Sequence, residues 1–286
     1  MNLPELLESR EVREQIAGAL IEDIGPADIT TETLVDEEQT ASARLLSRGE
    51  YVLAGGPVAQ LVFGLVDSRA RVEIHIQDGQ RIHPGDAIMT VTGRARGLLT
   101  AERTALNFIQ RMTGTATLTR QFVEKVARHK VAILDTRKTT PMMRTLQKYA
   151  VRCGGGQNHR LGLYDRILIK DNHLAFWREY GTGDIADAVR LAHKKFPKLI
   201  VEIEVENEQD LRRVLPAKPD WVMLDNMPVE HIRRCVEICK GRTKLEASGG
   251  VTLETVAAIA ATGVDAISIG SLTHSAPSAD LTLEFA

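Results

Sequence analysis

The stretch LIVEIEVENEQDLRRVLPAKPDWVMLDN, residues 199–226, decides the fold class of this chain. It opens with a largely apolar run at 199–205 and closes with a second at 221–224, and a helical pattern over 209–215 separates them. Short apolar runs of this kind indicate buried strands of a parallel sheet, because helices cover both faces of such a sheet. The stretch therefore predicts one strand, helix, strand unit of an α/β fold.

The same unit recurs along the second half of the chain. Further strands are expected at 131–134, 166–169, 244–247 and 266–269, with helices at 184–196, 229–240 and 253–262. Parallel crossovers are almost always right-handed, which favours a closed or nearly closed barrel. Six strands are fewer than eight, the number in a complete barrel, so an incomplete α/β barrel is consistent with the pattern.

The first third of the chain follows a different pattern. Leucines and isoleucines at helical spacing over residues 3–24 predict one or two short helices that end at Gly25 and Pro26. Short alternating segments separated by glycine-containing turns over 40–98 predict a small, strand-rich domain. A long helix over 101–128, with Gly114 as a candidate break, leads into the second domain.

Composition narrows the class of partner. Hydrophobic residues make up 43% and charged residues 26%, as in ordinary globular proteins. The 36 Lys and Arg nearly balance the 38 Asp and Glu, and a net charge of −2 provides no field that would attract nucleic acid or a membrane surface. No apolar run is long enough to span a bilayer. Three cysteines are too few for a disulfide framework, which favours a reducing, cytoplasmic location.

Polar residues follow every predicted strand, at the end where α/β barrels carry their reactive groups. One group is cationic and suits phosphates or carboxylates, since arginine binds a carboxylate through two parallel hydrogen bonds. A second group is acidic and suits Mg²⁺, bound directly or through water. The cationic residues are Arg137, Lys138, Arg160 and Lys170, with His159 beside them, and the acidic residues are Glu204 and Asp225.

Small residues follow the last two predicted strands, at Ser248-Gly249-Gly250 and at Ile269-Gly270-Ser271. Loops at these two positions form the recurrent phosphate site of barrels, because their backbone N–H groups can approach a phosphate closely. Either pair of small residues alone is ordinary turn chemistry. Together, at corresponding positions of adjacent strands, they favour a phosphate site.

Several other polar side chains have plainer interpretations. Cys235 and Cys239 lie one helical turn apart, without a second pair to complete a metal site, so core packing is favoured. Cys153 lies near the basic segment, but no base is clearly placed beside it, and a reactive thiol is disfavoured. His173 and His274 are expected to support neighbouring groups by hydrogen bonds rather than to catalyse.

Eight short motifs in this order closely resemble the quinolinate phosphoribosyltransferase family, and the resemblance covers essentially the whole chain. They are ERTALN at 102–107, DTRKTTP at 135–141, GGGQNHR at 154–160, IKDNH at 169–173, EIEVEN at 202–207, LDN at 224–226, EASGG at 246–250 and IGSLTH at 269–274. The resemblance implies that phosphoribosyl pyrophosphate and quinolinate react, with Mg²⁺, to nicotinate mononucleotide, pyrophosphate and CO₂.

The resemblance also implies an architecture. An N-terminal α+β sandwich domain is expected at 1–104, with the tail at 274–286 packed on it, and the barrel at 105–273. The active site is expected to be shared across a homodimer, which could assemble further into a hexamer.

Residue roles follow from the same resemblance. Quinolinate would be held by Arg103, Arg137, His159, Arg160 and Lys170, with Thr136 in the same loop. Lys138, Glu204 and Asp225 would be the catalytic residues that serve ribose, pyrophosphate and metal. The 5′-phosphate would bind at Ser248, Gly249, Gly250, Ile269, Gly270 and Ser271.

Two alternatives stay open at this point. A paralogous phosphoribosyltransferase would use another aromatic acid, such as nicotinate or a molybdenum-associated ligand, and the full cationic set would then exceed its needs. A non-catalytic sensor of a phosphate-bearing ligand would be expected to lack the metal-side acids, whereas Glu204 and Asp225 are both present.

Overall fold

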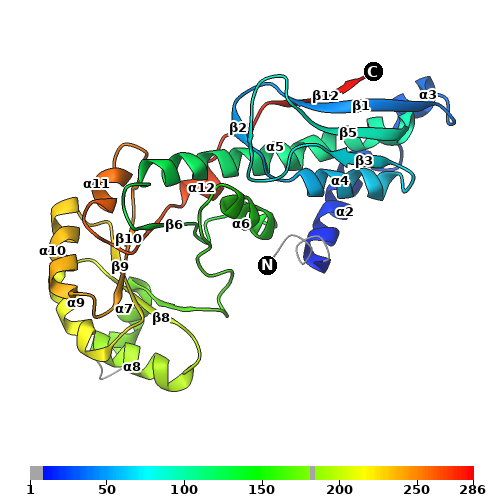
Figure 1. The fold of residues 1–286 in the computed structure, drawn as a ribbon. Helices are drawn as coiled ribbons and strands as arrows, with labels where there is room; N and C mark the ends of the chain where they lie inside the picture. Colours follow the sequence, from blue (N-terminus) through cyan, green and yellow to red (C-terminus); the bar gives the residue numbers. More distant parts are fainter. Residues whose placement is uncertain (1–8, 181–183) are drawn as a thin grey trace. The chain divides into compact units, whose positions relative to one another are not determined.

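The computed structural model describes residues 9–180 and 184–286 of the 286-residue chain. The chain forms two compact units, each assembled from separate segments. Unit 1 comprises Met1–Arg120, Thr139–Gly155 and Ser271–Ala286, and unit 2 comprises Gln121–Lys138 and Gly156–Gly270. Figure 1 shows the elements of both units coloured along the sequence.

Unit 2 is built on a parallel sheet of six strands, which confirms the predicted α/β class. In spatial order the sheet runs β6-β11-β10-β9-β8-β7. The edge strand β6 is extended by a parallel bridge between Leu134 and Gln157, so the segment that carries His159 lies beside it. The strands are β6 (Ala132–Leu134), β7 (Ile167–Ile169), β8 (Val201–Val205), β9 (Trp221–Asp225), β10 (Lys244–Ser248) and β11 (Ala266–Ser268).

Helices alternate with these strands, mostly where the apolar periodicity predicts them, although α7 (Asp171–Tyr180) was not predicted. Asp184 and Asp187 form a capping box at the start of α8, and the Asn207 side chain caps α9. In Figure 1, α8, α9 and α10 lie along one side of the sheet. The helices are α7 (Asp171–Tyr180), α8 (Ile185–Lys195), α9 (Glu208–Val214), the 3₁₀ turn η1 (Leu215–Ala217), α10 (Val229–Cys239) and α11 (Val256–Ala260).

Unit 1 contains an antiparallel sheet in the order β12-β1-β5-β3, packed with helices around one buried core. The strands are β1 (Thr40–Ser47), β3 (Arg71–Ile74), β5 (Ala87–Arg94) and β12 (Leu281–Phe285), and β2 (Tyr51–Val52) pairs with β4 (Arg81–Ile82). The helices are α2 (Arg10–Ile24), α3 (Ile29–Leu34), α4 (Gly56–Val66), α5 (Ala95–Lys125), α6 (Arg144–Cys153) and α12 (Ser271–His274). The part of the N-terminal helix prediction that falls on residues 3–8 lies outside the described residues.

Helix α4 was not predicted within the strand-rich segment 40–98. Its sequence, GPVAQLVFGLV, is apolar nearly all round, so it lacks the alternation of polar and apolar faces by which a surface helix is recognised. Val58, Val62 and Phe63 are buried in the core of unit 1. A short apolar run of this length is consistent with either a buried strand or a buried helix.

Gly114 does not break the long helix, because α5 is continuous from Ala95 to Lys125. The glycine serves packing instead. A Cβ at this position would collide with the carbonyl oxygen of Pro277, which lies on the C-terminal segment of the same unit. The absence of a side chain therefore lets the C-terminal segment pass directly against the helix.

The C-terminal segment completes the sheet of unit 1, since β12 pairs antiparallel with β1 from Ala43↔Phe285 to Ser47↔Leu281. Each compact unit combines segments from different parts of the chain. The predicted domain boundary at residue 104 stays a prediction. No helix in the described parts of the chain combines the length and apolar character that a membrane crossing requires.

Candidate active site

A cavity of about 330 Å³ opens at the carboxyl ends of the parallel strands in unit 2. Eleven of the predicted site residues line it, because each stands at or just after the end of a strand or in the segment beside β6. The lining comprises Thr136, Arg137, Lys138, His159, Arg160, Leu168, Lys170, Glu204, Met223, Asp225, Asn226, Glu246, Ser248, Gly249, Gly250 and Ser268.

Two arginines meet on one side of this cavity. Burial, reinforced by repulsion from Arg137, lowers the pKa of Arg160. The Arg160 Nη1 donates a hydrogen bond of 3.3 Å to the carbonyl oxygen of Arg166. Two guanidinium groups held close enough to repel one another are stabilised by an anion that binds both, and a carboxylate or phosphate matches their geometry.

Lys170 and Glu204 form an ion pair in the lining of the cavity. The Lys170 Nζ lies 2.7 Å from Glu204 Oε2, and the lysine side chain is far more exposed than the glutamate. The backbone N–H of Lys170 donates to Nδ1 of His173 at 2.9 Å, which gives His173 the supporting role expected for it. His274 likewise makes a local contact, with Nδ1 at 2.5 Å from Ser275 Oγ.

The acidic side of the cavity offers oxygen donors from two neighbouring strands. Glu204 lies on β8 and Asp225 ends β9, and these strands pair in parallel register. One oxygen of Asp225 accepts a hydrogen bond of 2.7 Å from the Asn226 side chain. Mg²⁺ is usually held by one or two carboxylates together with substrate phosphates, so this donor set fits a magnesium ion that arrives with a phosphorylated substrate.

The loop after β10 is shaped for close approach by a ligand. Gly249 and Gly250 adopt φ values of +97° and +60°, and a Cβ on Gly249 would collide with the Asn226 side chain. Asn226 also has positive φ, and its backbone N–H donates to the carbonyl oxygen of Ser248 at 2.8 Å. This packing holds the backbone of the glycine loop exposed to the cavity, as a phosphate site requires.

Beneath the cavity lies a buried polar cluster that the sequence interpretation missed. Glu202 and Glu246 are fully buried, and both approach the imidazole of His159. Arg166 Nε lies 3.2 Å from Glu202 Oε2, and its guanidinium lies 5.1 Å from the centre of the Trp221 ring. Burial raises the pKa of Glu202 and of Glu246, each to about 7. The sequence VEIEV could have indicated this cluster, because its glutamates alternate with valine and isoleucine in a predicted buried strand. Charged residues are rarely buried without partners.

His159, Glu202 and Glu246 bring ligand atoms close enough together for a metal ion. Arg166 already supplies positive charge at Glu202, however, and a guanidinium beside a carboxylate disfavours a second cation there. The cluster is therefore better described as a buried ion-pair network than as a metal centre.

Four predicted site residues lie outside this lining. Arg103 is exposed on α5 in unit 1, where it borders a smaller cavity with Asp23 and Asp28. Ile269, Gly270 and Ser271 follow β11 and begin α12.

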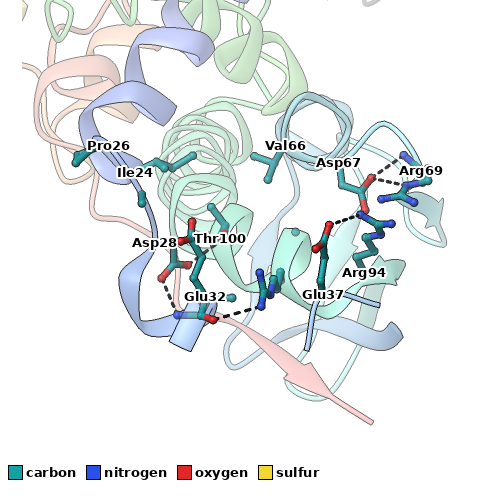
Figure 2. Close-up of a pocket in the computed structure, with 14 residues that line it drawn as sticks. Ile24, Pro26, Asp28, Glu32, Glu37, Val66, Asp67, Arg69, Arg94 and Thr100 are labelled. Atoms are coloured by element: carbon teal, nitrogen blue, oxygen red, sulfur yellow. Dashed lines mark hydrogen bonds and ion pairs between the residues drawn. The ribbon is translucent and has the colours of Figure 1, made fainter. Parts of the chain in front are cut away.

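A larger cavity of about 480 Å³ lies in unit 1 (Figure 2). Its charges largely bind one another: Arg94 lies 3.6 Å from Glu37, and Arg69 lies 3.5 Å from Asp67. Size alone therefore does not identify the active site, whereas the gathering of cations and acids at the strand ends of unit 2 distinguishes the smaller cavity.

The cysteines behave as the sequence predicts for core residues. Cys235 and Cys239 are buried on α10, and all three cysteines are free thiols. Burial raises the pKa of Cys153 to about 12, so its thiolate is scarce at neutral pH.

A parallel α/β sheet whose strand ends gather paired cations, two acids and a glycine loop defines an enzyme that acts on small, multiply anionic substrates. The chain belongs to the quinolinate phosphoribosyl transferase family. Residues 28–113 match the family's N-terminal domain, and residues 115–284 match its C-terminal domain.

Similar proteins agree over nearly the full length. The chain is 44% identical over 280 residues to a nicotinate-nucleotide pyrophosphorylase [carboxylating] of Mycobacterium leprae, covering 95% of this chain and 96% of that protein. It is 41% identical over 265 residues to a probable enzyme of the same name from Bacillus subtilis, covering 92% and 90%. The solved structure of the Francisella tularensis nicotinate-nucleotide pyrophosphorylase superposes with a TM-score of 0.90 at 40% identity, covering 96% of each chain.

Proposed function

We propose that this enzyme transfers the phosphoribosyl group of phosphoribosyl pyrophosphate to quinolinate and releases pyrophosphate and CO₂, forming nicotinate mononucleotide for de novo NAD synthesis. The observation that carries the proposal is a cavity lined by two arginines, Arg137 and Arg160, together with Lys170. A dicarboxylate such as quinolinate supplies the two anionic groups that such a set binds best. The names "carboxylating" and "decarboxylating", used among the relatives, describe opposite directions of one reaction.

The residues of the cavity suit each stage of this reaction. Arg137, Arg160 and Lys170 orient the acceptor so that its ring nitrogen faces C1 of the ribose, and Lys138 binds the departing pyrophosphate. Loss of pyrophosphate leaves positive charge on the ribose ring, which the carboxylates of Glu204 and Asp225 stabilise electrostatically. The ring nitrogen then bonds to C1 and becomes positively charged, and this charge stabilises the electron pair left on the adjacent ring carbon when its carboxylate departs as CO₂. A proton from water then takes the place of the carboxylate. Positioning and electrostatics therefore supply most of the catalysis.

Glu204 and Asp225 would also hold Mg²⁺, directly or through water, and the ion would neutralise charge on the pyrophosphate leaving group. Because Lys170 pairs with Glu204, binding of the acceptor would be coupled to binding of the metal or the ribose. When quinolinate draws Lys170 toward its carboxylates, one Glu204 oxygen becomes available to the metal or the ribose. Backbone N–H groups of 248–250 and 269–271 would bind the 5′-phosphate.

The assembly we propose is a homodimer with shared active sites, which could associate further into a hexamer. Arg103 would complete the acceptor site of the neighbouring subunit, since it is exposed on α5 and borders no part of the unit 2 cavity lining. Free thiols at all three cysteines suit a cytoplasmic location.

Two rival functions fit the cavity less well. A paralogue that takes a monocarboxylic acceptor would leave part of the cationic set without a partner, at a cost that grows with burial. A non-catalytic sensor would have no use for two carboxylates at the ribose side.

The acceptor can be tested with quinolinate labelled with ¹³C in the carboxylate next to the ring nitrogen. Labelled CO₂ should appear only when phosphoribosyl pyrophosphate is present, in step with nicotinate mononucleotide. Nicotinate should be used at least about a hundredfold less efficiently by kcat/KM, because the half-buried cations that bind the second carboxylate then lose their partner. Comparable kcat/KM for the two acids would rule out quinolinate as the specific acceptor.

The metal assignment has its own test. Glu204→Ala and Asp225→Ala should each lower kcat by about a hundredfold or more and weaken phosphoribosyl pyrophosphate binding more than quinolinate binding. Excess EDTA should abolish turnover, and added Mg²⁺ should restore it. Wild-type kcat in both variants, or full activity in EDTA, would exclude the metal role of this pair.

A further inference from the structure

The imidazole of His159 is buried, and both of its ring nitrogens are engaged by the protein. The Nδ1 atom accepts the backbone N–H of Arg160 at 2.7 Å. The Nε2 atom lies 3.0 Å from Glu202 Oε2 and 3.5 Å from Glu246 Oε2. A nitrogen that accepts a hydrogen bond carries no proton, so the proton lies on Nε2 and points toward the two carboxylates.

This arrangement limits what His159 can offer to a substrate. A histidine binds a carboxylate by donating an N–H, yet the N–H of His159 is already engaged by Glu202. His159 therefore lines the cavity while its Nδ1 holds the neighbouring backbone.

The segment around His159 is fixed from several sides. The backbone N–H of His159 donates to Asp135 Oδ1 at 2.9 Å, and the Asn158 side chain donates to Asp135 Oδ2 at 2.6 Å. The backbone N–H of Gln157 donates to the carbonyl oxygen of Ile133 in β6 at 2.8 Å. The carbonyl oxygen of Gln157 accepts from the backbone N–H of Asp135, the residue after β6, at 3.2 Å. The His159 imidazole adds a further constraint, because its Nδ1 accepts the backbone N–H of Arg160.

We propose that His159 is a positioning residue for Arg160, held in one tautomer by Glu202 and Glu246, and not itself a ligand of the acceptor carboxylates. The inference rests on the proposed function, in which Arg160 binds one carboxylate of quinolinate. Glu202 and Glu246 reach the ring from β8 and β10, two strands separated only by β9, so the sheet itself fixes the imidazole. The position of Arg160 then depends on two fully buried carboxyl groups.

A double-mutant cycle separates this role from direct binding. The variants are His159→Phe, which keeps a ring of similar size without nitrogens, Arg160→Ala, and the two together. The ligand is phthalate, which has both carboxylates of quinolinate but no nucleophilic nitrogen, and its affinity is measured by calorimetry. The matched control is His231→Phe, at an exposed histidine on α10.

If His159 acts through Arg160, the two substitutions are not additive. His159→Phe should weaken phthalate binding about tenfold in the wild-type background and less than about twofold once Arg160 is alanine. Phosphoribosyl pyrophosphate affinity should change less than about twofold in His159→Phe, and His231→Phe should bind both ligands as wild type does. Fold-losses that multiply in the double variant would overturn the proposal.

The ring itself provides a second measurement that does not depend on weak binding. The ¹⁵N chemical shifts of His159, assigned by comparison with His159→Phe, should be those of the Nε2–H tautomer and should stay so when phthalate binds. Conversion to an imidazolium or to the Nδ1–H tautomer on binding would show that His159 donates to the ligand. Failure of the wild-type enzyme to release CO₂ from quinolinate would count against the proposed function, whereas multiplicative effects in an active enzyme would count against the positioning role alone.

Discussion

At the scale of single residues, Glu246 illustrates how burial changes an ordinary carboxyl group. Loss of hydration, and after it repulsion from Glu202, raises its pKa from 4.5 to about 7. His159 and Arg166 also face the group and act in the opposite direction, but burial dominates. The folded protein therefore keeps a proton on Glu246 at pH values where the unfolded chain has lost it.

This shift predicts a dependence of stability on pH. Because the folded-state pKa is the higher one, the proton on Glu246 favours folding fully below about pH 4.5, and the contribution is lost as the pH rises toward about 7. Glu246→Gln stays neutral throughout. Its free energy of unfolding, relative to wild type, should therefore rise by about 1 to 3 kcal/mol between about pH 5 and about pH 7.5, measured by urea unfolding. Parallel pH profiles for the two proteins would show that the Glu246 pKa is not raised.

Much of the cavity could be anticipated residue by residue, because parallel strands bring their carboxyl ends to one edge and each end carried a recognisable polar group. Arg137, Glu204 and Asp225 follow this rule. Glu246 does not, since it lies in the middle of β10 and only the packing of the sheet shows that it borders the cavity. The contacts of the His159 imidazole with Glu202 and Glu246 were equally hidden, because they join segments far apart in sequence.

At the scale of elements, the strands of unit 2 were more predictable than the helices of unit 1. Buried parallel strands form short apolar runs, and all six were found within two residues of their ends. Helix α4 was missed because a helix that is apolar all round carries no periodic signal. Gly114 was misread because its role, contact with the Pro277 backbone, depends on a partner from the far end of the chain.

The glycine loop after β10 offers a matched pair of substitutions. Gly249→Ala would place a Cβ against the Asn226 side chain and backbone at positive φ, whereas Gly250→Ala points into open space. Gly249→Ala should therefore cost about 1 to 3 kcal/mol of stability and raise the KM for phosphoribosyl pyrophosphate about tenfold, with a smaller effect on quinolinate. Gly250→Ala should cost about 1 kcal/mol and change KM little. Equal kinetic effects of the two variants would contradict a loop held by Asn226.

At the scale of the whole molecule, the cationic residues assigned to the acceptor are divided between the two units. Arg137, Arg160 and Lys170 all come from unit 2, while Arg103 lies on the long helix in unit 1. Barrel sites ordinarily take their groups from strand ends, so Arg103 is the unusual member of the cationic set. A two-fold dimer would supply it reciprocally, each subunit completing the site of the other.

Subunit mixing tests this reciprocal arrangement. Arg103→Ala and Lys138→Ala homodimers should each be nearly inactive. If Arg103 acts in the neighbouring subunit, a mixed dimer has one site with both defects and one site with neither. Random exchange makes about half of the dimers mixed, each with one intact site of two, so about a quarter of wild-type activity should return.

The control is a mixture of Arg137→Ala with Lys138→Ala, two substitutions in the same cavity lining. Every mixed dimer then has one defect in each site, and no activity should return even though subunits exchange. Exchange itself is followed by mass spectrometry of differently tagged chains. Recovery in the first mixture and none in the control requires that Arg103 reach across the dimer, because no arrangement within one chain restores an intact site. If neither mixture regains activity although subunit exchange is demonstrated, Arg103 acts in the site of its own chain.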